Sequence, residues 1–221
     1  MTEYARIVAT IVLKDVRLEA RTRQTLIAST IFTLLVAIIF AFALDLAPAT
    51  ARAVAPGLLW ATLAFAGILG LGRSFAQESD HGTLDGLRLA PVDPSALYVG
   101  KMCGNFLLML LTLAVALPAF TILLGVDLLS PGVFPAALLG LLGFAAAGTL
   151  FSALSAAART RDVLLPILFL PLAIPVILTA TGATRFTLSS VSTANALGVL
   201  LACDALYVTA AVLLFIYTLE E

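Results

Sequence analysis

Six long apolar stretches constrain this chain more than any other feature of its sequence. They cover residues 25–44, 54–72, 97–124, 133–157, 162–181 and 196–218. A helix needs about 20 apolar residues to cross a hydrocarbon core roughly 30 Å thick, and each stretch is about that long. Lipid admits only helices and closed barrels, and these stretches are continuously apolar rather than alternating. The sequence therefore predicts an all-α integral membrane protein with six transmembrane helices.

The composition agrees with this prediction. Of the 221 residues, 62% are hydrophobic and 11% are charged, whereas soluble domains have about 25% charged residues. The net charge of -1 gives no case for nucleic-acid binding. Cys103 and Cys203 both lie inside apolar stretches, so we expect no disulfide framework. No apolar signal segment precedes the first stretch, which we expect to remain as an anchor.

The positive charges predict an orientation. Ten of the 12 lysines and arginines lie before the first stretch or in the second and fourth connections: Arg6, Lys14, Arg17, Arg21, Arg23, Arg73, Arg88, Lys101, Arg159 and Arg161. The other connections contain only Arg52 and Arg185. Because short loops rich in lysine and arginine stay in the cytoplasm, we expect cytoplasmic N- and C-termini.

Residues 1–24 form a separate element before the membrane domain of residues 25–221. A basic, polar stripe recurs at helical spacing and consists of Arg6, Thr10, Lys14, Arg17 and Arg21. The other side of the first turns is apolar and consists of Tyr4, Ile7, Val8, Ile11 and Val12. This pattern predicts an amphipathic helix in the interface beside anionic lipids. The alternative is flanking charge that only sets the topology.

The second connection contains a short passage with its own start and stop signals. Ser79 or Asp80 can cap a short helix, Leu84 and Leu87 share one of its faces, and Pro91 ends it. The only histidine of the chain also lies here, and no second histidine or carboxylate pair accompanies it at metal-binding spacing. We therefore predict a short cytoplasmic helix and no metal or catalytic site.

A second start signal follows directly. Asp93-Pro94 combines a cap with a proline at the first helical position, and it begins a helix that continues through Lys101 into the third stretch. The whole passage, residues 78–101, is thus a stiff elbow on the cytoplasmic side. Its leucine pair could dock into a partner's groove while the charges set orientation at the rim. The alternative is a solvated loop.

The fifth stretch contains Pro166, Pro171 and Pro175. Proline removes a backbone hydrogen bond and kinks a helix, and in lipid the freed carbonyls need partners on neighbouring elements. A kinked span that faces other helices is a candidate moving part; static curvature is the alternative.

Asp204 is an acid about eight residues into the sixth stretch. A charge at the centre of a membrane costs about 2.5–3.5 kcal/mol on insertion scales, so such a group usually faces a bundle interior or a wet cavity. It is a candidate lining or interhelical group. Alternatively, it lies near enough to the outer interface to stay wet.

Small residues recur in the fourth stretch. Gly148, Ser152 and Ala156 are spaced four residues apart, which lets helix backbones approach closely. We expect them to pack within the bundle or at a subunit interface.

Three passages resemble a known family. "GTLDGLRLAPVDPSALYVGK" is similar to the cytoplasmic stretch of ABC-2-type transporter permeases. "APGLLWATLAF" at 55–65 and "LPLAIPVILTAT" at 170–181 narrow the resemblance to CcmB, the permease subunit of the haem exporter in cytochrome c maturation. Members often carry an acid before the arginine that ends the second span, whereas this chain has Gly72-Arg73. No role of that acid can be carried over.

The resemblance implies an ABC permease subunit of the bacterial inner membrane that acts in haem export or delivery. The coupling helix would contain Asp80, Thr83, Leu84, Leu87, Arg88 and Pro91. The implied partners are a CcmA-like ATPase, a CcmC-like haem-handling membrane protein, a CcmE-like haem chaperone and a second copy of the chain. Whether haem crosses this subunit, or ATP use releases the loaded chaperone, stays open.

The sequence also limits the possible chemistry of the chain, independently of the family resemblance. No G-x-x-x-x-G-K-[ST] phosphate cradle exists, so ATP hydrolysis must come from a partner. The connections at 45–53, 125–132 and 182–195 contain no His, Cys, Met or Tyr, the residue types that hold haem iron. We expect haem to be a substrate here and not a bound cofactor. An ABC-2 permease for a lipid or polysaccharide is the nearest alternative, followed by a non-transporting scaffold; missing catalytic sets disfavour an intramembrane enzyme.

Overall fold

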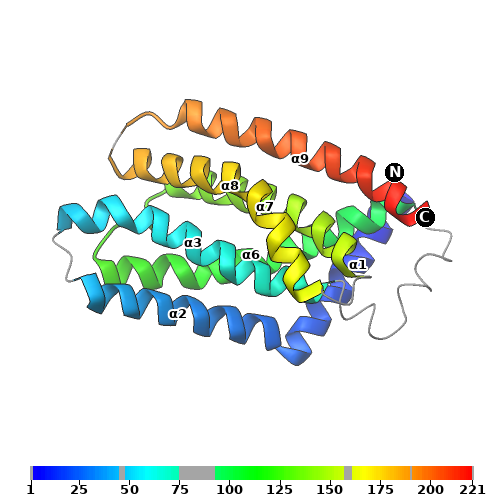
Figure 1. The fold of residues 1–221 in the computed structure, drawn as a ribbon, viewed down its shortest axis with the longest axis horizontal. Helices are drawn as coiled ribbons and strands as arrows, with labels where there is room; N and C mark the ends of the chain where they lie inside the picture. Colours follow the sequence, from blue (N-terminus) through cyan, green and yellow to red (C-terminus); the bar gives the residue numbers. More distant parts are fainter. Residues whose placement is uncertain (1, 45–47, 75–92, 157–160, 190, 221) are drawn as a thin grey trace.

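The computed structural model describes residues 2–44, 48–74, 93–156, 161–189 and 191–220. This part of the chain forms α1 (Thr2–Thr22), α2 (Gln24–Leu44), α3 (Pro48–Ser74), α6 (Pro94–Leu124), α7 (Val133–Ala156), α8 (Arg161–Leu188) and α9 (Ala194–Glu220). All but α1 are long and apolar enough to cross a membrane, which makes six spans. The predicted all-α membrane fold is confirmed (Figure 1). The predicted short helix before Pro91 lies outside the described residues.

Two helices extend beyond their apolar stretches. α3 begins at Pro48 instead of residue 54, and α8 continues to Leu188 instead of residue 181. Both extensions are rich in alanine, threonine and arginine, which a helix accepts but a search for apolar residues passes over. The added turn of α8 makes a contact of its own, since the Thr187 hydroxyl donates to the Gly132 carbonyl at 3.3 Å.

The helices form one bundle with both termini at the same end (Figure 1). α7 and α3 lie near its centre, because 67% and 56% of the residues in their membrane-spanning parts are buried. In α2 and α9 the buried share is only 17%, so these helices present most of their surface to the surroundings. We call the end with the termini the terminal end and the other the distal end.

α1 lies at the terminal end and packs against the first half of α6. Its apolar side makes this contact: Ile11 lies close against Gly100, and the Ser95 hydroxyl donates to the Tyr4 hydroxyl at 3.3 Å. The predicted helix and its two-sided character are confirmed. Because α6 covers part of the apolar side, that side is not available entirely to lipid.

The bend between α1 and α2 is made by Arg23. Its backbone is left-handed, with φ 53°, and it is the only non-glycine residue with positive φ in the described chain. This conformation costs an L-residue about 1–2 kcal/mol. The Glu19 carboxylate supports the bend from the inside, since its Oε1 accepts a hydrogen bond from the amide of Leu26 at 2.8 Å. That bond satisfies one of the orphan amides at the start of α2.

Both ends of α6 have local capping signals. The Asp93 Oδ1 accepts from the Ser95 amide at 2.8 Å, and Pro94 occupies the first helical position, as predicted. At the other end Gly125 closes the helix in the left-handed conformation, with φ 64°. Glycine takes this conformation without a steric penalty.

The centre of the bundle depends on close approach at α7. Gly140 lies directly against the indole ring of Trp60, and a Cβ there would also come within 2.9 Å of the Ala180 Cβ. The indole cannot move aside easily, because its Nε1 donates to the Thr184 hydroxyl at 3.1 Å. Gly148 is equally close to the side chain of Leu71 on α3. The predicted packing of small residues within the bundle is confirmed at Gly148.

Gly140→Ala should therefore destabilise the bundle. We expect a loss of about 1–3 kcal/mol in the free energy of unfolding, because the methyl group overpacks a rigid site. The measurement is unfolding of the purified protein by a denaturing detergent in mixed micelles. Gly57→Ala is the matched control: nothing lies within 4 Å of its added Cβ, so it should leave stability unchanged or raise it. Equal effects of the two substitutions would contradict this packing argument.

Candidate functional site

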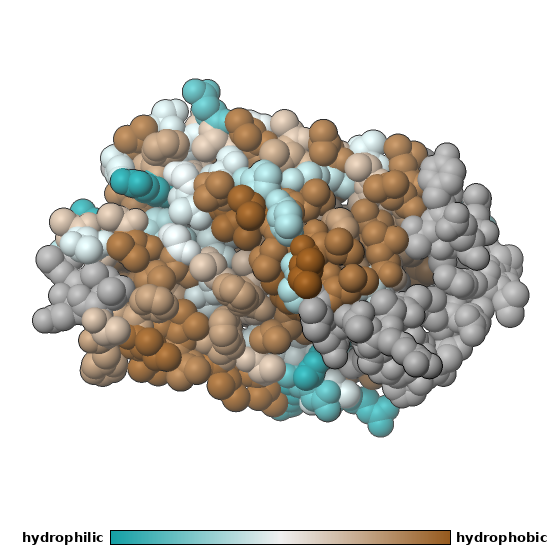
Figure 2. Space-filling view, viewed as in Figure 1, coloured by the Kyte–Doolittle hydropathy of each residue, from teal (hydrophilic) through white to brown (hydrophobic). Residues whose placement is uncertain are grey.

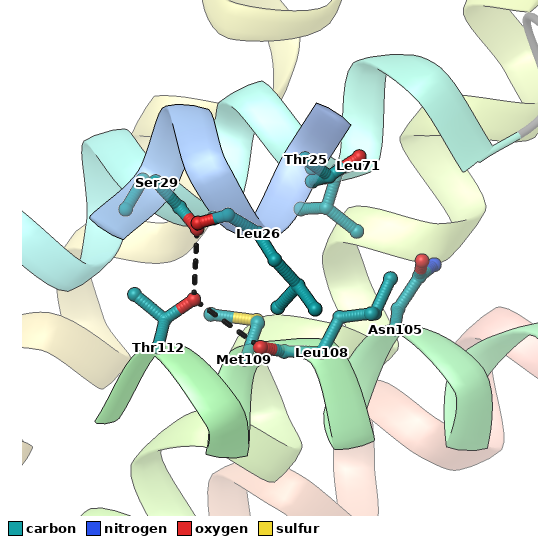
Figure 3. Close-up of a pocket in the computed structure, with 11 residues that line it drawn as sticks. Thr25, Leu26, Ser29, Leu71, Asn105, Leu108, Met109 and Thr112 are labelled. Atoms are coloured by element: carbon teal, nitrogen blue, oxygen red, sulfur yellow. Dashed lines mark hydrogen bonds between the residues drawn. The ribbon is translucent and has the colours of Figure 1, made fainter. Parts of the chain in front are cut away.

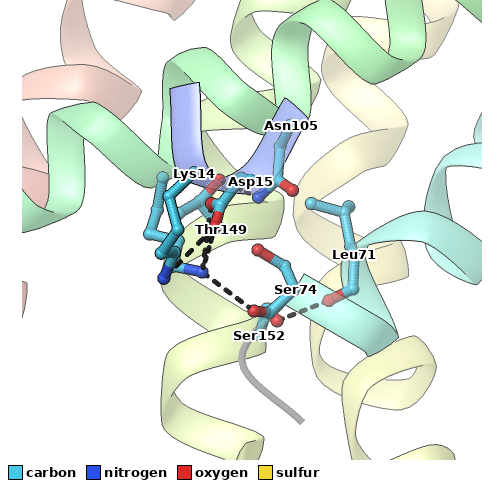
Figure 4. Close-up of polar contacts among 8 residues, drawn as sticks. Lys14, Asp15, Leu71, Ser74, Asn105, Thr149 and Ser152 are labelled. Atoms are coloured by element: carbon cyan, nitrogen blue, oxygen red, sulfur yellow. Dashed lines mark hydrogen bonds and ion pairs between the residues drawn. The ribbon is translucent and has the colours of Figure 1, made fainter. Parts of the chain in front are cut away.

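The residues predicted to couple to a partner lie outside the described part of the chain. These are Asp80, Thr83, Leu84, Leu87, Arg88 and Pro91. The described residues on either side of them, at the end of α3 and the beginning of α6, meet in a polar cluster at the terminal end of the bundle (Figure 4). We call it the helix-end cluster and define it as Asp15, Leu71, Ser74, Lys101 and Ser152.

The cluster satisfies the C-terminal carbonyls of α3. The last four carbonyls of a helix have no partner within it. Here the Ser152 hydroxyl of α7 donates to the Leu71 carbonyl at 2.5 Å, and the Lys101 ammonium of α6 donates to the Ser74 carbonyl at 3.1 Å. A cation at this position also complements the negative end of the helix dipole. The end of α3 is thus bound to two other helices.

An ion pair extends the cluster to α1. The Lys101 Nζ lies 3.1 Å from Asp15 Oδ2, and the lysine side chain is only 2% exposed. Lys14 lies on the outer side of the same carboxylate, with Nζ 3.3 Å from Oδ1. One buried ammonium therefore connects α1, α3 and α6 (Figure 4).

Sequence reasoning missed Asp15 and Ser74. A signal for Asp15 was present: it follows Ile11 by four residues and so falls on the apolar side of α1, where an unpaired acid would be costly. Glu19 continues the same side and is also buried. Ser74 offered no signal, because it contributes its backbone carbonyl only.

Polar pairs continue from the cluster into the bundle. The Asn105 amide of α6 donates to the Thr149 hydroxyl of α7 at 2.9 Å, and Thr112 donates to Ser29 of α2 at 3.2 Å. Figure 3 shows the hydrogen bond between Ser29 and Thr112 among the residues that line a cavity between α2, α3 and α6.

Two small cavities lie along this row. One, of about 10 Å³, lies beside Ser29 and Thr112; the other, of about 30 Å³, lies beside Asp15 and Arg73. They share four lining residues, namely Thr25, Gly70, Asn105 and Leu108. Such volumes hold one or two water molecules, since a water needs about 10–15 Å³. Ligand pockets for larger molecules measure about 300–1,000 Å³. Neither cavity can hold a haem; both are suited to water beside the buried polar groups.

Asp204 lies inside the bundle, about 15 Å along α9 from its first residue. It is 4% exposed, so its side chain is enclosed by the helices around it. Its carboxylate lies directly against Gly143 of α7, in space that any larger residue would fill. Neither carboxylate oxygen has a hydrogen-bond partner among the described residues. Sequence and structure agree on an unusual intramembrane acid.

The prolines of α8 lie on its outer side. Pro171 and Pro175 are exposed and Pro166 is half-buried, so they face away from the centre of the bundle. The helix continues unbroken from Arg161 to Leu188. Between the last two prolines, the Leu172 carbonyl accepts a hydrogen bond from the Tyr207 hydroxyl of α9 at 2.9 Å. This carbonyl is not one that a proline frees, because Pro171 and Pro175 free the carbonyls four residues before them. A partner for the freed carbonyls and a moving part both stay predictions.

Comparisons with known proteins point to one family. The family model described as CcmB protein matches residues 6–219. A protein named heme exporter protein B from Paracoccus denitrificans is 28% identical over 176 residues, which cover 79% of this chain and 81% of the relative. The protein of the same name from Bradyrhizobium diazoefficiens is 27% identical over 173 residues, 78% of each chain. A third, from Pseudomonas aeruginosa, is 26% identical over 197 residues, covering 89% of this chain and 88% of the relative.

The buried ion pair of the helix-end cluster can be tested by a double-mutant cycle. Asp15→Asn removes the Asp15 charge from its pair with the buried Lys101 ammonium, and the loss of this charge-assisted hydrogen bond should cost about 1.5–3 kcal/mol in the free energy of unfolding. If the two side chains interact, the loss in the Asp15→Asn, Lys101→Met double variant should be smaller than the sum of the two single losses. Glu3→Gln, on the exposed N-terminal turn of the same helix, is the control and should change stability by less than about 0.5 kcal/mol. Additive losses in the double variant would show that the two side chains do not interact.

Proposed function

This chain belongs to the CcmB family, and on that basis we propose that it is the membrane-spanning permease subunit of a haem exporter that acts in cytochrome c maturation. The observation that carries the proposal is the match over residues 6–219, which includes all six spans. The chain is a transporter component rather than a catalytic enzyme. The named relatives are haem exporters, which supports haem over a lipid or polysaccharide as the substrate.

We place the terminal end of the bundle in the cytoplasm of a bacterial cell, at the inner membrane. The excess of lysine and arginine in the segments at this end supports that orientation. α1 would then lie at the cytoplasmic interface as an amphipathic helix preceding the permease domain of residues 25–221.

ATP hydrolysis belongs to a partner in this proposal, because the sequence has no phosphate cradle. A CcmA-like ATPase would dock on the segment at 78–101, with Leu84 and Leu87 as the apolar anchors. The helix-end cluster supports the choice of this segment. The segment begins shortly after Ser74 and ends within α6 at Lys101, which ties the end of α3 and α1 to α6. Movement of the docked segment would therefore reach three helices together.

The haem ligands belong to other subunits in this proposal. The connections at the distal end contain no residue type that holds haem iron. Tyr207 is bonded to a backbone carbonyl, and Met109 is buried in the core, so both have packing functions. CcmC-like and CcmE-like partners would bind the iron. A second copy of this chain would complete the permease, since transporters of this type need about twelve spans.

Docking can be tested by pull-down of the ATPase with the tagged full-length chain. Leu84→Asp combined with Leu87→Asp should abolish co-purification, because two charges in an apolar groove are costly to desolvate. Leu129→Asp, at an exposed leucine of the distal connection, is the control and should leave the complex intact. A wild-type complex with a non-hydrolysing ATPase should assemble but fail to support cytochrome c formation. Normal cytochrome c formation with that ATPase would show that this chain acts only as a scaffold.

Asp204 is the intramembrane group that we propose to be functional. Asp204→Asn keeps the shape of the side chain and removes its ability to ionise. We expect unchanged assembly and an unchanged or higher free energy of unfolding, with cytochrome c formation reduced about tenfold or more, because an intramembrane acid retained at a cost to stability marks a working group. The measurement is haem-stained cytochrome c in cells that carry the variant at normal abundance. An unchanged cytochrome c yield would show that Asp204 has only a packing role.

A further inference from the structure

The corner between α1 and α2 forms a groove that the proposed function does not use. Its lining consists of Ala20, Arg23, Leu26, Ile27, Thr30 and Ile31. Arg23 lies at the bend and is the only charged residue among the described residues of the lining. Ile27 and Ile31 follow it at intervals of four residues and therefore lie on the same side of α2. They are 52% and 61% exposed, so the groove combines one cation with an open aliphatic wall.

Arg23 is the wrong residue for the backbone conformation that it adopts. A left-handed φ of 53° favours glycine, and asparagine tolerates it better than arginine does. Strain kept at one residue points to a requirement for its side chain. The Arg23 Nε donates to the Ala20 carbonyl at 3.4 Å, which holds the guanidinium beside the groove. No acidic side chain among the described residues pairs with it.

Acidic and basic side chains near this corner lie on opposite sides of α1. The acids of α1 near this corner face inward: Glu19 is buried and bonded to the Leu26 amide, and Asp15 pairs with Lys101. The exposed side carries Arg17, Arg21 and Arg23. In Figure 2 hydrophilic residues gather at the lower edge of the molecule, next to the apolar surface over α2. The corner thus presents positive charge where an apolar surface begins.

We infer that this corner binds an anionic phospholipid, with its phosphate on the Arg23 guanidinium and one acyl chain along Ile27 and Ile31. Guanidinium pairs with phosphate through two parallel hydrogen bonds. Exposed aliphatic residues continue along α2 at Leu34, Leu35 and Ile38. One leaflet is about 15 Å thick and corresponds to about ten helical residues, so this wall is long enough for an acyl chain. None of the described residues that line the groove is of a type that holds haem iron.

A tryptophan placed in the groove can report on the lipid beside it. The full-length chain with Ile31→Trp is reconstituted into phosphatidylcholine vesicles that contain brominated phosphatidylglycerol or brominated phosphatidylcholine as quenchers. The native Trp60 is buried and adds a nearly constant background. Ile122→Trp is the control reporter, because Ile122 is 78% exposed on α6 near the distal end. The ratio of the two quenching curves gives the local preference for the anionic lipid.

We expect a preference for phosphatidylglycerol of about fivefold at Ile31→Trp, the effect of one arginine near the membrane surface, and none at Ile122→Trp. Arg23→Gln should abolish the preference, and Arg23→Lys should retain part of it. Arg23→Gly should also abolish it while leaving the unfolding midpoint unchanged or higher, because the backbone strain is relieved. If Arg23 only shaped the bend, its substitutions would not abolish the lipid preference while leaving the unfolding midpoint unchanged or higher.

Four results would overturn the inference. Equal quenching by the two lipids would remove the anionic preference, and a preference that survives Arg23→Gln would assign it to other residues. Competition by inorganic phosphate at millimolar concentration would indicate a simple anion site. Protection of Ile31→Trp from both brominated lipids would indicate that a second protein copy covers the groove. Each result is independent of ATPase docking and of haem, so the proposed function stands or fails separately.

Discussion

Hydrogen bonds from side chains to the backbone carbonyls of neighbouring helices are the interaction on which this bundle depends. Lipid offers no hydrophobic force between helices, so association rests on close packing and interhelical bonds. Tyr98 donates to the Ala146 carbonyl, Ser152 to that of Leu71, and Tyr207 to that of Leu172. Each such bond contributes only about 0.6 kcal/mol. Their main effect is to set the rotation of each helix, after which the glycines of α7 allow the backbones to approach.

α7 has the largest buried share because it takes part in most of these contacts. It accepts from Tyr98 of α6, donates from Ser152 to α3, and gives Gly140 to Trp60 and Gly143 to Asp204. A shift of α7 would disturb α3, α6 and α9 together. The helix-end cluster has the same property at the terminal end, where Lys101 joins three helices. A movement that begins at either place would be shared by several helices, which is what the proposed driving of this chain by an ATPase partner requires.

The sequence predicted the spans and the cap at the start of α6, because both depend on local properties. Apolar length identified the six membrane helices, and Asp93-Pro94 marked the start of α6 to the residue. The helix-end cluster was not predictable in the same way. Asp15 and Lys101 are 86 residues apart, and periodicity along one helix does not identify the helix that it will meet. Arg23 was also missed, since arginine is an ordinary helix residue and carries no turn signal. Asp204 was found because a charge within an apolar stretch is conspicuous, although only the structure shows that it faces Gly143.

The inward position of the acidic side chains also makes the exposed surface of α1 more positive. Net charge over α1 understates its exposed positive charge, because Asp15 and Glu19 are withdrawn into contacts with Lys101 and with the start of α2. What faces the surroundings at the corner is chiefly arginine. The same arrangement therefore has two consequences: the inward acids fasten α1 to the bundle, and the outward arginines attract anionic headgroups. Replacing either acid would both loosen the helix and change the surface charge beside it, so the two effects have to be separated by variants that alter the arginines alone.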